Sequence, residues 1–138
     1  MSKIQVDWNS FKEVEVVLKS ELDRLMKLRG GLKTIKVAIN RRKQALQQLY
    51  EWMDFLRNHH LYSGERGERM KQLLEMLTSF KGRERVKRLE LQLLKITPIS
   101  HYRYALRLKA KRVPKQDKII ISAELGLNDW GNIGFYMD

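Results

Sequence analysis

Apolar side chains in residues 11–56 recur in steps of three and four, which is the spacing of helices that pack along a coiled-coil seam. The first series consists of Phe11, Val14, Leu18, Leu25 and Leu28. The second series, beyond Gly30 and Gly31, consists of Leu32, Ile35, Ile39, Leu46, Leu49, Met53 and Leu56. Two long helices are therefore predicted, and the capping-box spacing of Ser10 and Glu13 places the start of the first at Ser10.

A polar residue occupies one seam position in each series, Glu21 in the first and Arg42 in the second. Glycine is a poor helix former and a good helix terminator, so Gly30 and Gly31 favour a turn between two antiparallel helices. In that hairpin Glu21 and Arg42 face each other, and we predict a shielded ion pair between them. Such a pair adds little net stability but fixes the register of the helices.

A single bent helix over residues 10–60 is the competing interpretation. The apolar phase continues across the glycines, because the step from Leu28 to Leu32 is again one of the seam. This helix would dimerise as a coiled coil, but two interior glycines cost about 2 kcal/mol relative to alanine. The hairpin is the favoured prediction, and either form gives a long helical element suited to a homodimer.

The pattern after residue 58 predicts a loop, a short third helix and then strands. The third helix covers residues 68–80, and Gly82 marks its end. Period-two alternation and β-branched residues predict strands at 88–96, 101–112 and 118–125, with an edge strand at 132–137. The predicted fold class is α+β, with the helical hairpin or coiled coil and the third helix followed by a small antiparallel β-meander. The helical part covers residues 1–82 and the basic β part residues 83–138, and we expect one integrated domain.

Residues 101–112 carry the most informative pattern for function. One set of alternate positions is apolar and holds Tyr102, Tyr104, Leu106, Leu108 and Ala110. The other set holds Arg103, Arg107, Lys109 and Lys111, with only Ala105 interrupting the cations. Such a strand buries its apolar side and exposes a basic side that has no carboxylate. The basic side either contacts an anionic partner or is a solvated surface that protects a sheet edge. The single sign of the charge favours the partner, because solubilising surfaces usually mix signs.

Two further basic clusters are candidate phosphate contacts. The first precedes the β region and consists of Arg83, Arg85, Lys87 and Arg88. If strands 88–96 and 101–112 pair, this cluster lies near Lys109, Lys111 and Arg112 and merges with them into one patch. The second cluster, Arg41 and Lys43, lies on the second helix. The alternatives are separate solvated clusters in the first case and a solvated coiled-coil flank in the second.

Composition adds a strong positive charge to this picture. The 138 residues include 28 Lys and Arg against 16 Asp and Glu, for a net charge of +12. This imbalance favours a polyanionic partner, such as DNA, RNA or an acidic protein surface, over a membrane. The chain has no cysteine, which excludes disulfides, thiolate chemistry and Cys-ligated zinc. Without an apolar leader or membrane span, we expect an intracellular protein of the cytoplasm, nucleoid or nucleus.

Catalytic and metal-binding patterns do not emerge from the sequence. His59 and His60 are adjacent and point in different directions, and no third ligand is evident, so no metal site is predicted. No phosphate-binding glycine loop or nucleophile motif occurs. Tyr102 and Tyr104 share a face with leucines, which favours core packing over base stacking. We therefore expect no cofactor and no enzymatic activity.

The function predicted is non-enzymatic nucleic-acid binding, mainly through phosphate contacts and with strong salt dependence. The binding surface is the basic strand and the adjoining basic cluster. The alternative is a protein-interaction or assembly module whose helical element docks a protein partner. A weaker alternative is a small component of a larger ribonucleoprotein.

Overall fold

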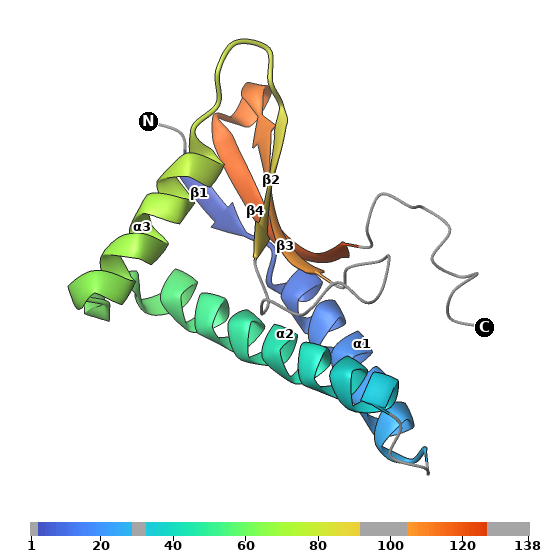
Figure 1. Cartoon of the computed structure of the whole chain (residues 1–138). Helices are drawn as coiled ribbons and strands as arrows, with labels where there is room; N and C mark the ends of the chain where they lie inside the picture. The colour runs from blue at the N-terminus through green and yellow to red at the C-terminus, as the bar shows by residue number, and fades with distance from the viewer. Residues whose placement is uncertain (1–2, 29–32, 92–104, 127–138) are drawn as a thin grey trace.

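The computed structural model describes residues 3–28, 33–91 and 105–126. The chain begins with strand β1 (Lys3–Val6), helix α1 (Trp8–Met26) and helix α2 (Lys33–Asn58). A 3-10 turn (His59–Leu61) leads to helix α3 (Gly64–Thr78). Strands β2 (Val86–Leu91), β3 (Ala105–Val113) and β4 (Lys118–Gly126) follow, with a 3-10 turn (Pro114–Gln116) between the last two. The predicted α+β class is confirmed (Figure 1).

Helices α1 and α2 form the predicted hairpin rather than one continuous helix. They lie side by side and run in opposite directions (Figure 1), while Gly30 and Gly31, predicted to form the turn, lie outside the described residues. The side chains that α1 buries are Phe11, Val14, Leu18, Leu22 and Leu25. The predicted seam is confirmed up to Leu25 but not at Leu28, which is 50% exposed near the tip of the hairpin.

The predicted ion pair joins the two helices at the middle of the hairpin. Arg42 Nε donates to Glu21 Oε1 at 3.0 Å, and the side chains are 8% and 19% exposed, respectively. Arg42 Nη1 also donates to the carbonyl oxygen of Ala38 at 3.1 Å. A charged pair at a largely apolar interface can satisfy both partners only in one register. The pair therefore fixes how α1 and α2 align.

The start of α1 differs from the prediction. Asp7, not Ser10, is the N-cap, and its side chain accepts from the backbone N–H of Ser10. The Ser10 hydroxyl donates to the Asp7 carbonyl at 2.6 Å and accepts from the N–H of Ala123 on β4 at 3.0 Å. Aspartate caps helices as well as serine does, which is why the capping-box spacing at Ser10 was misleading. Ser10 instead ties the first turn of α1 to the sheet.

The sheet contains four strands in the order β1-β4-β3-β2. Strands β2, β3 and β4 form the predicted antiparallel meander. Strand β1 adds a parallel pairing with β4 that the sequence did not predict, because its apolar alternation covers only Ile4 and Val6. The N–H of Asp7 continues this edge by donating to the Ile121 carbonyl at 2.8 Å.

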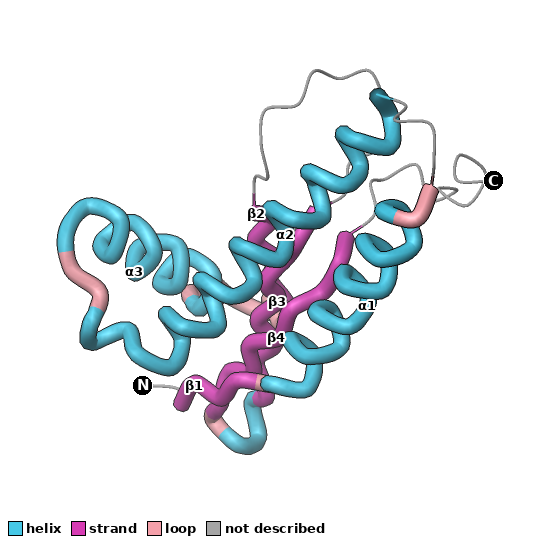
Figure 2. Tube along the Cα trace, turned by 90° about the horizontal axis from the view of Figure 1, so that it is seen from below, coloured by secondary structure: helices cyan, strands magenta, loops and turns pink. Residues whose placement is uncertain are grey.

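One face of the sheet packs against all three helices. The strand residues buried there are Leu106, Leu108, Ala110, Ile119, Ile121 and Ala123. Helix α1 contacts β4, α2 contacts β3, and α3 contacts β2 and β3; Figure 2 shows α1 and α2 lying along the strands. Because α2 touches both α1 and the sheet, it buries a wider stripe than its seam, adding Ala45, Trp52 and Phe55. Helices and sheet thus share one hydrophobic core.

Other boundaries also shift. Helix α3 starts at Gly64, earlier than the predicted residue 68, and Gly64 has the positive φ of 78° that glycine adopts easily. Strand β2 starts at Val86, so the ambiguous segment before residue 88 is partly strand. The predicted edge strand at 132–137, together with the predicted strand residues 92–96 and 101–104, lies outside the described residues.

We predict strong coupling between Glu21 and Arg42. Arg42→Met alone removes the guanidinium that donates to the Glu21 carboxylate at a site where that side chain is only 19% exposed, and it should lower the free energy of unfolding by about 3 kcal/mol. In a Glu21→Leu background the same substitution should cost far less, because the carboxylate to which Arg42 donates is already absent. Denaturant titration of the wild type, the two single variants and the double variant measures the coupling, and additive costs would contradict the pairing.

Candidate nucleic-acid interface

The face of the sheet opposite the helices, here called the outer face, carries the basic side of β3. Leu106, Leu108 and Ala110 are fully buried on the helix side. The alternate residues Arg107, Lys109 and Lys111 therefore point to the outer face. Arg103, the remaining cation of the predicted row, lies outside the described residues.

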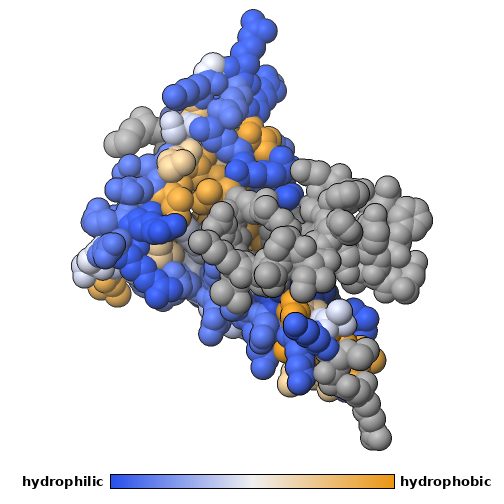
Figure 3. Space-filling model, in the orientation of Figure 1, coloured by the Kyte–Doolittle hydropathy of each residue, from blue (hydrophilic) through white to orange (hydrophobic). Residues whose placement is uncertain are grey.

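Strand pairing brings the basic segment before β2 beside the basic end of β3. Val86 is the Cα partner of Lys111, and Arg88 is the partner of Lys109. The N–H of Arg112 donates to the Arg85 carbonyl at 2.9 Å, which extends the pairing beyond β2. Arg83 and Arg85 are both exposed. The loop before β2 and the turn before β4 lie at the top of Figure 1, and this end of the molecule is hydrophilic in Figure 3.

The end of the outer face around Arg107 is partly neutralised by a carboxylate from β4. Glu124 is the Cα partner of Arg107. Its Oε1 accepts from Arg88 Nε at 2.7 Å, so the Arg88 side chain crosses β3 to reach it. Inspection of β3 alone shows only cations, whereas the folded sheet places an acid among them. Arg88 and Arg107 are therefore weaker candidates for phosphate contact than their sequence positions indicated.

Four lysines of the outer face, which we call the lysine track, have a different environment. Their side chains come from β1, β4 and β3 and belong to Lys3, Lys118, Lys111 and Lys109. Within the described parts of the chain, no carboxylate lies within ion-pair distance of any of them. Sequence reasoning missed Lys3 because β1 was not predicted. It missed Lys118 because consecutive isoleucines in β4 hide which residues face outward.

Two of the predicted contacts, Arg112 and Lys87, point instead toward the helix side. The Arg112 guanidinium lies 5.4 Å from the centre of the Phe80 ring, and its Nη2 donates to the Gly82 carbonyl at 3.1 Å. The Lys87 ammonium lies near the same ring, 3.7 Å from Glu84 Oε2. These side chains hold residues 79–85 against β2 and β3. They position the loop that presents Arg83 and Arg85.

Arg41 and Lys43 belong to another layer of the molecule. Both lie on α2, which packs on the helix side of the sheet. The sheet separates them from the lysine track. The cluster of Arg41 and Lys43 and the basic patch around β3 therefore lie on opposite sides of the sheet.

A second polar cluster joins α2 to α3. The Tyr62 hydroxyl donates to Asp54 Oδ2 at 2.5 Å, and this bond raises the pKa of Tyr62 to about 12 and lowers that of Asp54. Arg66 donates to both carboxylate oxygens of Glu51. A Cβ on Gly67 would approach the Tyr62 carbonyl carbon to 2.9 Å, so this corner is tightly packed. Its hydrogen bonds are satisfied among themselves, which indicates a structural joint between the helices.

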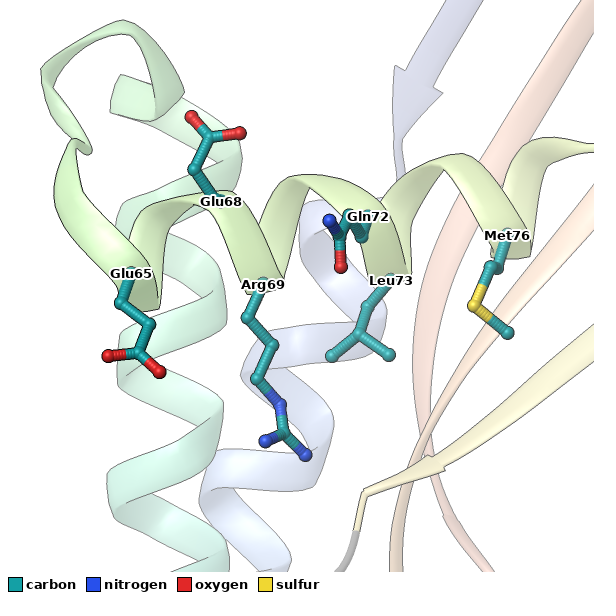
Figure 4. Close-up of a pocket in the computed structure, with 6 residues that line it drawn as sticks. All are labelled: Glu65, Glu68, Arg69, Gln72, Leu73 and Met76. Atoms are coloured by element: carbon teal, nitrogen blue, oxygen red, sulfur yellow. The ribbon is translucent and has the colours of Figure 1, made fainter.

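A shallow hollow of about 430 Å³ lies along α3. Figure 4 shows that its lining side chains all come from this helix: Glu65, Glu68, Arg69, Gln72, Leu73 and Met76. Glu68 is paired with Lys71 at 3.5 Å, and Met76 is exposed. The hollow brings together no nucleophile and base, and it supports no catalytic assignment.

Over residues 3–28, 33–91 and 105–126, no group of three or more His, Asp or Glu side chains is arranged to hold a metal ion. None of the described helices is long and apolar enough to cross a membrane. Comparisons of the chain with protein-family models, curated proteins and solved structures found no match. The charged surface is therefore the feature of this chain that bears on its function.

We predict that Arg112 contributes more to stability than the exposed arginine beside it. Arg112→Gln removes the ring contact and weakens the bond to Gly82, and it should lower the free energy of unfolding by about 1–2 kcal/mol. Arg85→Gln, at an exposed position, should change it by less than about 0.5 kcal/mol. Denaturant titration compares the two variants, and equal effects would show that Arg112 does not anchor the loop.

Proposed function

We propose that the protein is a non-enzymatic nucleic-acid-binding protein that contacts mainly the phosphate backbone. The observation that carries the proposal is the convergence of cations from separate segments at one end of the sheet. Lys109 and Lys111 lie on the outer face, and Arg83 and Arg85 are exposed on the adjoining loop. Cations gathered in excess over carboxylates repel one another and attract polyanions. Glu84, the acid between the two arginines, is paired with Lys87.

The chemistry of the surface favours backbone contact over base recognition. The described outer-face residues offer ammonium and guanidinium groups, while the aromatic side chains Phe11, Trp52 and Phe55 are buried in the core. Base stacking requires an exposed aromatic platform, whereas phosphate contact requires only placed cations. Binding is therefore expected to tolerate many sequences.

A protein-interaction role for the helical hairpin is the second candidate. Val16 and Met26 on α1 are 61% and 62% exposed, so the hairpin presents apolar side chains away from the sheet. We propose this surface as the contact of a homodimer or of a protein partner. Reversal of the outer-face charges leaves such a contact intact, and measurement of mass in solution reports it directly.

Nucleic-acid binding should depend strongly on salt. With four to six phosphate contacts, affinity for a DNA duplex should fall on the order of a hundredfold to a thousandfold between 50 and 200 mM salt. The variant Lys109→Glu with Lys111→Glu should lose on the order of tenfold or more in affinity at the lower salt. Titration against labelled duplex and single-stranded DNA and RNA measures both effects.

The matched control is Lys12→Glu with Lys33→Glu. Both residues are exposed on the helices, and the change in net charge is the same. An equal loss of affinity in the control would mean that net charge, not this surface, drives binding. Absence of binding by the wild type to every nucleic acid at 50 mM salt would refute the proposed function.

A further inference from the structure

Strands β1 and β4 begin with lysines that lie directly opposite each other. Lys3 and Lys118 are Cα partners in the parallel pairing. Both point to the outer face, because the next residue of β4, Ile119, is only 5% exposed on the helix side. Like charges at opposed positions destabilise a sheet. An anion held by both ammonium groups relieves this repulsion, so the pair is itself a sign of an anionic ligand.

The positive charge continues from this pair onto β3. Lys111 is opposed to Ile120, which places it diagonally from Lys118 at roughly 7–8 Å between Cα atoms. Lys109 follows two residues along β3, roughly 7 Å further. The lysine track therefore extends for roughly 20 Å across three strands. One strand of B-DNA carries a phosphate for every 3.4 Å or so of helix axis, so such a track meets several phosphates of one backbone.

The part of the outer face that lies beyond Lys109, toward Arg107 on β3, is less suited to a polyanion. Glu124 lies there beside Arg107, and its side chain is 30% exposed and paired with Arg88. A phosphate placed over Arg107 would approach this carboxylate. The favourable path therefore leaves β3 at Lys109 and Lys111 and turns across the sheet toward β1.

We propose that one phosphate backbone crosses the outer face along Lys109, Lys111, Lys118 and Lys3, and not along the length of β3. This inference rests on the proposed nucleic-acid binding and adds two binding residues, Lys118 and Lys3, from outside the basic strand. Strand β1 is thereby a functional part of the interface. The parallel pairing at the sheet edge brings its lysine into line with those of the meander.

The test is the double variant Lys3→Gln with Lys118→Gln, titrated with a 20-base-pair DNA duplex over a range of salt. Loss of two phosphate contacts should reduce the slope of log affinity against log salt by about 1.8. The matched control, Lys12→Gln with Lys33→Gln, should leave the slope unchanged. Arg88→Gln should also leave it unchanged, because Arg88 is neutralised by Glu124.

Measuring the stability of the unbound variant shows whether a loss of binding comes from lost phosphate contacts or from misfolding. Because the substitution removes like-charge repulsion, Lys3→Gln with Lys118→Gln should unfold at the same or a higher denaturant concentration than the wild type. If the wild type binds DNA but the variant keeps the wild-type slope, the proposed path is wrong and the proposed function still stands. Retained binding combined with new self-association would assign the two lysines to protection of the sheet edge instead. Absence of wild-type binding refutes the proposed function itself.

Discussion

The alternation of side chains along β3 is the constraint on which the rest of the structure depends. This strand is paired on both sides, and Leu106, Leu108 and Ala110 are fully buried against the helices. A slip of one residue would expose these three side chains and bury the cations between them, so the hydrophobic core fixes the register. Burial of the apolar set therefore dictates which charges face outward. The basic outer face is a direct consequence of how the core is packed.

The register with the neighbouring strands then determines which of those charges have no acidic neighbour in the described strands. Glu124 of β4 arrives opposite Arg107 and pairs with Arg88, which neutralises that end of the outer face. At the other end, the pairing of β4 with β1 adds Lys118 and Lys3 and brings in no carboxylate from the described strands. A segment that reads as uniformly basic thus becomes a surface with two unlike ends. The difference comes from side chains of the neighbouring strands β1, β2 and β4.

Local periodicity explains what could be predicted from the sequence. The seam of α1 and α2, the ion pair of Glu21 with Arg42, and the meander of β2, β3 and β4 all follow from repeating patterns within single elements. Strand β1 could not be predicted, because four residues carry too little alternation and the pairing partner lies more than a hundred residues away. The sequence also did not show which of Ile119 and Ile120 points toward the helices. Both are apolar, and only the position of the helices distinguishes the two faces of the sheet. For the candidate site, the sequence therefore indicated Lys109 and Lys111 but missed Lys3 and Lys118.

The parallel edge strand also couples the charged surface to the docking of the helical hairpin. The N–H of Asp7 bonds to Ile121 and the Ser10 hydroxyl accepts from Ala123, so the end of β1 and the start of α1 are fastened to β4 together. Opposed lysines on β1 and β4 cost roughly 0.2–1 kcal/mol through repulsion, an amount that these hydrogen bonds and the burial of Phe11 beneath them can offset. The helices thus do more than cover the sheet. By holding β1 against β4, they maintain two like charges side by side, which is the arrangement that an anionic backbone can use.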